Sequence, residues 1–349
     1  MLMFEDMANT LSGWLSGEGE ESMVVLSTRV RMARNLTNVI YPGAAGEDVK
    51  SNVIGFFESA QGRSEMLSDG KLLKASELND IDRDFLVERH LMSPVFMQDN
   101  SSRALYVRND ELLSVMINEE DHFRIQALAP ALNLNKALHI ATEFENELGQ
   151  YLEYDYDSDF GFLTACPTNV GTGMRASVLV HLPGLVITKD IDRVIARISK
   201  MGVTVRGFYG EGTDVLGNLF QVSNQTTLGI TEQQILELID RVTRSIIKEE
   251  VAARERLVNE ALKQMEDKIW RAYGILKHAR MLTSDEVMNL LSAVRLGVAM
   301  NIIDFLDIAT INEMLLLSQP AHLQKYYQKE LSPDERDLVR AELVRNRLA

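Results

Sequence analysis

Three short apolar runs, joined by turns of only a few polar residues, constrain the fold of this chain more than any other feature of its sequence. The runs are residues 103–107, 111–117 and 122–128. Turns this short connect antiparallel neighbours, because a parallel pair needs a crossover of about a dozen residues or more. This part of the chain therefore predicts antiparallel strand hairpins.

Apolar patterning extends this prediction over residues 23–250. Further strands are expected at residues 24–26, 176–182 and 203–208. Apolar residues at helical spacing predict helices at residues 81–89, 132–151, 190–201 and 232–250. An antiparallel sheet covered by helices follows, which places this part of the chain in the α+β class.

The last third of the chain has no strand pattern, and apolar residues recur at helical spacing over residues 257–276. Thr283 with Glu286, and Ser332 with Glu335, have the spacing of capping boxes that open helices. We therefore predict an N-terminal segment over residues 1–22, a mixed domain over 23–253 and an all-helical domain over 254–349.

Composition excludes several classes of function. The chain of 349 residues has a net charge of −15, which argues against a nucleic-acid partner because binding a duplex needs a basic face. Its single cysteine, Cys166, leaves no pair for an intramolecular disulfide and no cysteine-based zinc site. Residues 1–10 do not resemble a signal peptide, and no stretch has the roughly 18 apolar residues of a membrane helix. We therefore expect a cytoplasmic protein whose acidic surface attracts basic substrates.

The common sequence signatures of phosphate binding are missing. No P-loop pattern occurs, and the motif set of the serine, threonine and tyrosine protein kinases is absent. The glycine motifs Gly171-Thr-Gly173 and Gly210-Glu-Gly212 are too short for a dinucleotide fingerprint. Nucleotide binding would need another arrangement of residues.

Four segments place arginine or carboxylate side chains at the ends of predicted strands. They are Ser27-Thr-Arg29-Val-Arg31, Asn118-Glu-Glu-Asp-His122 with Arg124, Cys166-Pro-Thr-Asn-Val-Gly-Thr-Gly-Met-Arg175, and Arg206-Gly-Phe-Tyr-Gly-Glu211 followed by Asp214. Each alone has an ordinary interpretation, because charged residues are frequent at strand edges and in polar turns. A lone cysteine before proline is usually a small buried hydrophobic residue. The coincidence of all four favours a shared functional site.

These motifs resemble those of the phosphagen (guanidino) kinase family, which includes creatine and arginine kinases. The resemblance includes Val222-Ser-Asn224 before Leu228-Gly229, and Glu88-Arg-His90 close to Ser93-Pro94. It spans residues 23–250 and is specific, because several motifs of five or more residues agree in order. Phosphagen kinases carry a helical domain before the first motif, where this chain has only residues 1–26, so we expect an open site. This feature and the added C-terminal helices resemble bacterial protein arginine kinases, which mark proteins with phosphoarginine for the Clp protease.

The resemblance implies a kinase that uses ATP with Mg²⁺. It implies that the triphosphate is clamped through charge-assisted hydrogen bonds by Arg29, Arg31, Arg124, Arg175 and Arg206. It places His90 beside the nucleotide and implies further nucleotide-binding positions at Ser27, Thr28, Val30, Ala176, Ser177, Val178, Leu179, Gly207, Phe208, Tyr209, Gly210 and Glu211. Tyr209 replaces an arginine that is typical of arginine kinases, so that charged contact is expected to be lost. Water and phosphate would supply most of the Mg²⁺ ligands, so we expect no protein metal site.

The acceptor needs a base, because a guanidinium has no free lone pair and is a poor nucleophile. Glu120 matches the family's catalytic glutamate and would orient the guanidinium and accept its proton. Asp214 falls where phosphagen kinases often have a second glutamate, and Glu211 is an alternative for that role. Cys166 matches the family's reactive cysteine, whose thiolate would be stabilised by nearby positive charge and would tune the acceptor without attacking phosphate.

The last predicted helix carries a further motif. Arg336 and Arg340 share one face of it, with Asp337 three residues before Arg340. A solvated, salt-bridged surface is the ordinary interpretation. The run from Arg336 to Ala341 resembles the phosphoarginine-sensing motif of protein arginine kinases, which implies an allosteric phosphoarginine site at Arg336, Asp337, Arg340 and Ala341.

Three functions remain open at this point. The favoured one is a protein arginine kinase, which implies protein substrates with exposed arginines, the Clp protease system, a regulatory activator protein and a homodimer formed through the helical domain. The second is a phosphagen kinase acting on free arginine or a related small guanidine. The third is an inactive adaptor that binds phosphoarginine or a Clp partner, which the intact Glu120, Cys166 and arginines argue against. Apolar helical faces over residues 257–317 are either internal core or a subunit contact, and core is the default.

Overall fold

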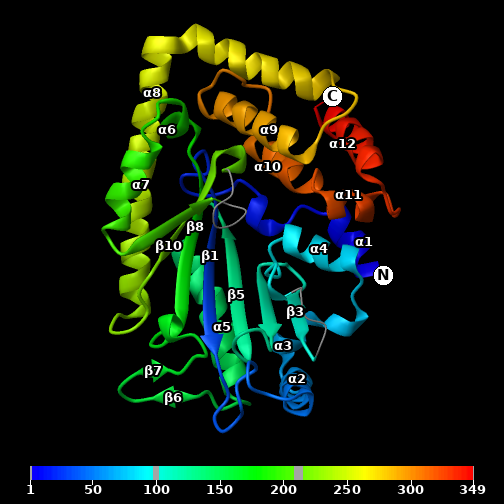
Figure 1. Cartoon of the computed structure of the whole chain (residues 1–349), viewed down its shortest axis with the longest axis vertical. Helices are drawn as coiled ribbons and strands as arrows, with labels where there is room; N and C mark the ends of the chain where they lie inside the picture. Colours follow the sequence, from blue (N-terminus) through cyan, green and yellow to red (C-terminus); the bar gives the residue numbers. More distant parts are fainter. Residues whose placement is uncertain (1, 97–101, 208–214, 349) are drawn as a thin grey trace.

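The computed structural model describes residues 2–96, 102–207 and 215–348. Its centre is an eight-stranded sheet with the order β2-β3-β4-β5-β1-β8-β10-β9, in which all the neighbouring pairs run antiparallel (Figure 1). The strands are β1 (Val25–Arg34), β2 (Gly70–Lys74), β3 (Ala104–Arg108), β4 (Leu113–Ile117), β5 (Phe123–Pro130), β8 (Met174–His181), β9 (Val203–Gly207) and β10 (Leu219–Asn224). A separate hairpin consists of β6 (Tyr156–Asp157) and β7 (Gly161–Phe162). The α+β prediction is confirmed, and the three apolar runs form the consecutive strands β3, β4 and β5.

Strand β1 is longer than the predicted run over residues 24–26, and it lies near the middle of the sheet between β5 and β8. Its sequence alternates apolar and charged residues beyond that run. Val30 and Met32 are buried on one face, whereas Arg29 and Arg31 point to the other. This alternation gives the sheet one apolar face and one polar face.

Helices cover the apolar face. Helix α5 (Leu134–Gly149) packs on β1 and β5, and the first half of α8 (Glu232–His278) packs on β8 and β10. The shared core contains Ile140 and Phe144 of α5 together with Ile239 and Ile246 of α8. Because these helices occupy only this face, the polar face is left for a site.

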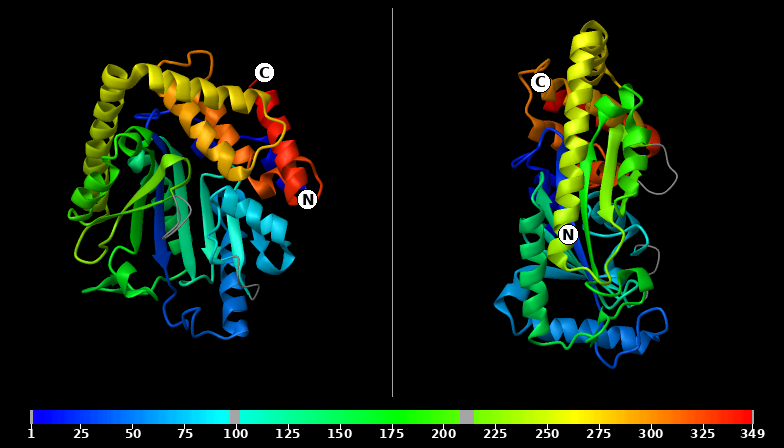
Figure 2. Two further views of the ribbon diagram at one scale, coloured as in Figure 1. Left: turned by 45° about the horizontal axis from the view of Figure 1, so that its top comes forward. Right: turned by 90° about the vertical axis from the view of Figure 1, so that its left-hand side faces the viewer.

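Helix α8 joins the mixed and helical parts of the chain. The predicted helical stretches at residues 232–250 and 257–276 both belong to this element of 47 residues, which is kinked at Ala261, where the dihedral angles are non-helical (φ −144°). Figures 1 and 2 show it rising beside the sheet and then turning across the top of the molecule. The predicted domain limit at residues 253 and 254 therefore lies inside a continuous helix.

The helical part continues with α9 (Ser284–Ala299), α10 (Ile308–Leu317), α11 (Pro320–Tyr326) and α12 (Pro333–Arg347). At the start of α12, Ser332 and Glu335 make both bonds of the predicted capping box, and Thr283 accepts from the Glu286 backbone N–H at the start of α9. Three residues of the sheet, Leu26, Leu179 and Leu219, belong to the hydrophobic core of these helices, so the sheet and the helical part are packed together.

The remaining helices are α1 (Leu2–Asn9), α2 (Glu47–Gln61), α3 (Glu65–Ser68), α4 (Asp80–Glu88), α6 (Pro183–Ile187) and α7 (Ile191–Ser199). A small core containing Met7, Phe85 and Ala321 joins α1, α4 and α11. Within the described ranges, no helix is both long and apolar enough to cross a membrane.

Candidate active site

The polar face of the sheet gathers arginines from three neighbouring strands. Arg29 and Arg31 come from β1, Arg124 from β5 and Arg175 from β8, and Arg31 lies directly opposite Arg175 in the strand pairing. Arg29 Nε donates to Ser177 Oγ at 3.4 Å. Arg206 lies on β9, opposite Gln221 of β10. Strand pairing therefore unites the arginines of all four segments that the sequence singled out.

The electrostatics of this cluster favour an anionic ligand. Burial, and then the charges of Arg124 and Arg175, lower the pKa of Arg29 to about 10. Burial and the same positive neighbours also lower the pKa of Arg31, and burial followed by the charges of Arg206 and Arg124 lowers the pKa of Arg175. Positive groups held this close repel one another, and several phosphate oxygens would relieve that repulsion through charge-assisted hydrogen bonds.

A cavity of about 320 Å³ opens beside the cluster. Six predicted nucleotide-binding residues line it: Ser27, Arg29, Arg31, His90, Ser177 and Leu179. Arg29 and Arg31 make its lining charged, and Trp14, Leu128 and Leu179 add apolar surface. A nucleotide, which combines a charged triphosphate with a largely apolar purine, suits this mixed lining.

Four other predicted nucleotide-binding residues have side chains that point away from this cavity. Val30, Ala176 and Val178 have side chains in the core on the apolar face, and the Thr28 hydroxyl donates to the Ala131 carbonyl at 2.8 Å. The reason is strand alternation, which sends every second side chain of β1 and β8 away from the polar face. Their part in the site is to support the strands.

His90 lies in the wall of this cavity, next to Trp14. Its backbone has a φ of +61°, and its carbonyl accepts from Gln126 Nε2 at 2.6 Å. The ring of Trp14 meets the His90 ring edge-on, with centroids 5.0 Å apart. Burial, and then the Arg29 charge, lower the pKa of His90 to about 3, so the imidazole is neutral at ordinary pH.

Several lining residues were not predicted. Trp14, Gln126 and Gln221 face the cavity, and Glu88 lies in its wall. Gln126 was accessible to sequence reasoning, because it lies two residues after Arg124 on the same strand face. Trp14 was not, because it belongs to a segment remote from the predicted strands.

The turn between β4 and β5 holds two glutamates in different surroundings. Glu119 is buried, forms an ion pair with Arg124 and accepts from Ser93 Oγ at 2.5 Å. Glu120 is exposed, and its negative charge partly opposes the burial that lowers the pKa of Arg175. Glu120, predicted as catalytic, is therefore within electrostatic range of one arginine of the anion-binding cluster.

Asp121 ties this turn to the cysteine loop. Its buried carboxylate oxygen Oδ1 accepts from Asn35 Nδ2 at 2.6 Å and from the Ala165 backbone N–H at 2.7 Å. Asn35 in turn accepts from the His122 backbone N–H at 2.9 Å. The Asp121 side chain, which follows Glu120, thus binds Asn35 at the end of β1 and Ala165 just before Cys166.

The cysteine loop is braced from the other side as well. Thr227 Oγ1 donates at 2.9 Å to the Thr168 carbonyl, and Cys166 Sγ lies 3.0 Å from Thr168 Oγ1. Gly171 has a φ of +111°, and a Cβ there would lie 2.3 Å from the Thr227 carbonyl oxygen. Only glycine permits the two segments to approach this closely.

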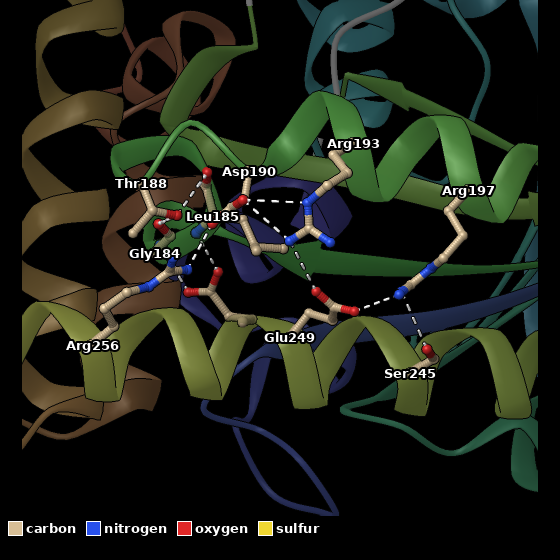
Figure 3. Close-up of polar contacts among 10 residues, drawn as sticks. Gly184, Leu185, Thr188, Asp190, Arg193, Arg197, Ser245, Glu249 and Arg256 are labelled. Carbon is tan, nitrogen blue, oxygen red and sulfur yellow. Dashed lines mark hydrogen bonds and ion pairs between the residues drawn. The ribbon is translucent and has the colours of Figure 1, made fainter.

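Five predicted site residues lie outside the described part of the chain: Phe208, Tyr209, Gly210, Glu211 and Asp214. Gly207, also predicted, ends β9 opposite Phe220. The helix before this strand, α7, is held on α8 by ion pairs of Arg193 and Arg197 with Glu249, and Asp190 pairs with Arg256 at 2.6 Å (Figure 3). This network fixes the edge of the sheet from which Arg206 projects.

The predicted phosphoarginine residues lie on α12 and do not line the cavity. Arg336 and Asp337 are half-buried, whereas Arg340 and Ala341 are buried. Arg340 donates at 2.7 Å to each of the Ser318 and Leu282 carbonyls and at 2.5 Å to Asp337. In this structure Arg340 therefore joins three parts of the helical region.

Among the described residues, no group of three or more histidine, cysteine, aspartate or glutamate side chains has the arrangement of a metal site. Glu119 is a carboxylate beside the arginine cluster. This donor set fits Mg²⁺ that is held mainly by nucleotide phosphates and water.

Comparison with known proteins agrees with this geometry. The sequence model of the ATP:guanido phosphotransferase C-terminal catalytic domain matches residues 48–253. The chain belongs to the ATP:guanido phosphotransferase family. Residues 262–349 match the protein-arginine kinase McsB C-terminal domain, so the chain falls in the branch of bacterial protein-arginine kinases. The family match begins after Ser27–Arg31, which the strand pairing of β1 nevertheless places in the site.

Relatives match this chain along nearly its whole length. The chain is 45% identical to the protein-arginine kinase of Desulforamulus reducens, over 100% of this chain and 98% of that protein. It is 43% identical to the corresponding kinases of Halothermothrix orenii, over 99% of both chains, and Geobacillus stearothermophilus, over 99% of this chain and 96% of that protein. This ATP:guanido phosphotransferase is therefore a kinase.

Solved structures show the same fold at lower sequence identity. A lombricine kinase superimposes with a TM-score of 0.59 at 23% identity, over 71% of this chain and 70% of that chain. The substrate-free duplicated taurocyamine kinase from Schistosoma mansoni gives a TM-score of 0.59 at 22% identity, over 77% of this chain and 41% of that chain.

Proposed function

We propose that this kinase transfers the γ-phosphoryl group of ATP to the guanidino group of arginine side chains in proteins. The observation that carries the proposal is that the Asp121 hydrogen bonds hold the turn of Glu120 to the loop of Cys166, close to an arginine cluster that adjoins a nucleotide-sized cavity. The names of the full-length relatives support protein-bound arginine as the acceptor.

The arginine cluster supplies positioning and charge neutralisation, which are the main needs of phosphoryl transfer. Arg29 and Arg31 lie in the cavity wall, and Arg124 and Arg175 border the adjoining pocket around Gly173. When bound with the nucleotide, Mg²⁺ would neutralise part of the triphosphate charge. Glu119 would hold Arg124 in place through their ion pair.

Glu120 acts as the base of the reaction. Its carboxylate orients the acceptor guanidinium and takes its proton as the nitrogen–phosphorus bond forms and the bond between the γ-phosphorus and its bridging oxygen breaks. ADP leaves with that oxygen. Cys166 follows Ala165, whose backbone N–H binds Asp121, and it tunes the acceptor electrostatically. Asp214 or Glu211 would complete the acceptor site, in the role of a second carboxylate.

Phosphorus NMR with ATP and Mg²⁺ tests this proposal, run in parallel on free arginine and on an arginine-rich unfolded protein. An acid-labile nitrogen–phosphorus signal on the protein alone is expected, and Glu120→Ala should abolish it while retaining nucleotide binding. A signal on free arginine alone would instead identify a phosphagen kinase. Absence of a signal on either acceptor would favour an adaptor that binds phosphoarginine.

The resemblance to protein arginine kinases supports wider roles for the same chain. We propose that its product marks proteins for the Clp protease system in the cytoplasm, that a regulatory activator protein acts on it, and that it forms a homodimer through the helical region. An acidic chain of net charge −15 is suited to attracting arginine-bearing segments of substrates.

The α12 motif is proposed as an allosteric phosphoarginine site. Arg336 would contact the phosphoryl group and Asp337 the guanidino group, while Ala341 and the buried Arg340 support them. Replacing Arg336 and Asp337 by alanine should abolish activation by added phosphoarginine and spare basal activity. Activation that persists in this double variant would remove the motif from consideration.

A further inference from the structure

Three consecutive residues at the end of α4 connect the nucleotide cavity to a helix far away in sequence. Glu88 and His90 both line the cavity. The Glu88 carboxylate accepts hydrogen bonds from the backbone N–H groups of Ala321 and His322, each at 2.8 Å. These N–H groups belong to the first turn of α11, where an intrahelical partner is lacking and a carboxylate is favourable.

Arg89, between them, strengthens the same connection. It is fully buried and forms a bidentate ion pair with Glu111, with hydrogen bonds of 2.7 and 2.8 Å. Its Nη1 donates at 2.8 Å to the Met7 carbonyl and lies 3.4 Å from His322 Nε2. Arg89 thus holds the end of α4 against both α11 and the N-terminal segment.

The backbone between Glu88 and His90 has little conformational freedom. His90 adopts a left-handed φ of +61°, and Gln126 on β5 binds its carbonyl at 2.6 Å. A displacement of α11 would move the Glu88 carboxylate, and the short connection would pass this displacement to the imidazole that faces the ligand. Trp14 would move with them, because its ring packs against His90.

Helix α11 is itself joined to the rest of the helical region. The carbonyl of Ser318, just before α11, accepts from Arg340 of α12 at 2.7 Å. On its other side, α11 packs on α4, where Lys325 pairs with Asp82 and the rings of His322 and Phe85 lie 4.7 Å apart. The position of α11 therefore depends on both the helical region and α4.

We infer that Glu88 is a positioning residue that makes nucleotide affinity depend on the docking of α11. This inference rests on the proposed nucleotide site, and it assigns a part of that site to the helical region. The consequence is reciprocal, because loss of the Glu88 hydrogen bonds to the first turn of α11 lowers nucleotide affinity, and bound nucleotide stabilises those hydrogen bonds.

The test compares Glu88→Gln with Lys325→Met in the full chain. Glutamine keeps the size of the side chain but replaces one acceptor oxygen by a donor, so one N–H of α11 loses its partner. Lys325→Met breaks the ion pair with Asp82 in the same α4–α11 contact without touching the cavity. Both variants are made with Trp270→Phe, so that Trp14 remains the single tryptophan and reports MgADP binding by its fluorescence.

We expect Glu88→Gln to weaken MgADP binding about tenfold and to raise the KM for ATP in step, while the KM for the arginine acceptor stays unchanged. Lys325→Met should leave MgADP affinity within twofold of the parent. Partial unfolding would lower kcat without this selective change in KM. Should Glu88→Gln fail to fold, Glu88→Asp retains the charge but draws the carboxylate back by about 1.5 Å, and it should weaken MgADP binding in the same direction.

MgADP affinity within twofold of the parent in the folded Glu88 variant would overturn this inference alone. An equal loss of affinity in Lys325→Met would also overturn it, because the effect would then come from the α4–α11 contact as a whole. A parent protein that binds no MgADP at all would overturn the proposed function and this inference with it.

Discussion

Removal of the Asp121 carboxylate should both destabilise the protein and slow phosphoryl transfer. In Asp121→Ala, Asn35 Nδ2 and the Ala165 N–H lose the acceptor that they share at 2.6 and 2.7 Å. Hydrogen bonds to a charged group contribute about 1.5–3 kcal/mol each. Because Asn35 Nδ2 also donates to the Leu163 carbonyl at 3.1 Å, one of the two losses is partly compensated. We therefore expect a loss of about 2–4 kcal/mol in the free energy of unfolding.

The effect on catalysis follows from the same contacts. Asp121 directly follows Glu120 and binds the residue before Cys166, so its removal frees both catalytic residues to move relative to the arginine cluster. A displacement of about 1 Å of a catalytic group can lower the rate about a hundredfold. We expect kcat to fall by about that factor, with a much smaller change in the affinity for MgADP, because Asp121 does not line the cavity.

Urea unfolding and steady-state kinetics on Asp121→Ala measure the two effects. Asp69→Ala is the matched control, since Asp69 is exposed and accepts from Asn109 Nδ2 at 2.7 Å near the far edge of the sheet. The control should change unfolding by less than about 0.5 kcal/mol and leave kcat intact. A kcat within threefold of the parent in Asp121→Ala would refute the proposed link between the turn and the cysteine loop.

Two further predictions concern the cysteine loop and the response to acid. Gly171→Ala should slow phosphoryl transfer and lower the thermal unfolding midpoint, because its Cβ would lie 2.3 Å from the Thr227 carbonyl oxygen and the backbone φ there is +111°. Kinetic and thermal measurements compare this variant with Gly55→Ala, whose added Cβ has no neighbour within 4 Å. Equal effects in the two variants would contradict the prediction. Burial, and then the Arg89 charge, lower the pKa of His322 from 6.5 to about 3, so the unfolded chain binds more protons in that window. The stabilisation from His322 is therefore complete above pH 6.5 and is lost as the pH falls towards 3, by up to about 1.4 kcal/mol per pH unit. Urea unfolding at pH 7 and pH 5 should show this loss, and a smaller one in His322→Gln; an unchanged pH dependence in the variant would rule out His322 as its source.

Local features of the sequence determined much of this protein. Short polar turns specified the hairpins of β3, β4 and β5, since a connection of only a few residues cannot join two parallel strands. Alternation along β1 placed Arg29 and Arg31 on one face, and Ser332 with Glu335 marked the start of α12. The motifs also identified the family, which the comparisons confirm. All of these signals reside in residues that are neighbours in the chain.

Tertiary structure decided which residues from distant parts of the sequence lie close together. The turn of Glu120 and the loop of Cys166 are joined at Asp121 only because β1 brings β5 and β8 to its two sides. The contact of Glu88 with Ala321 spans 233 positions in the sequence and has no local signature. Trp14 enters the cavity wall from a segment outside the sheet. Such contacts depend on the packing of whole elements, whereas periodicity and turn chemistry describe each element alone, so only the folded chain could reveal them.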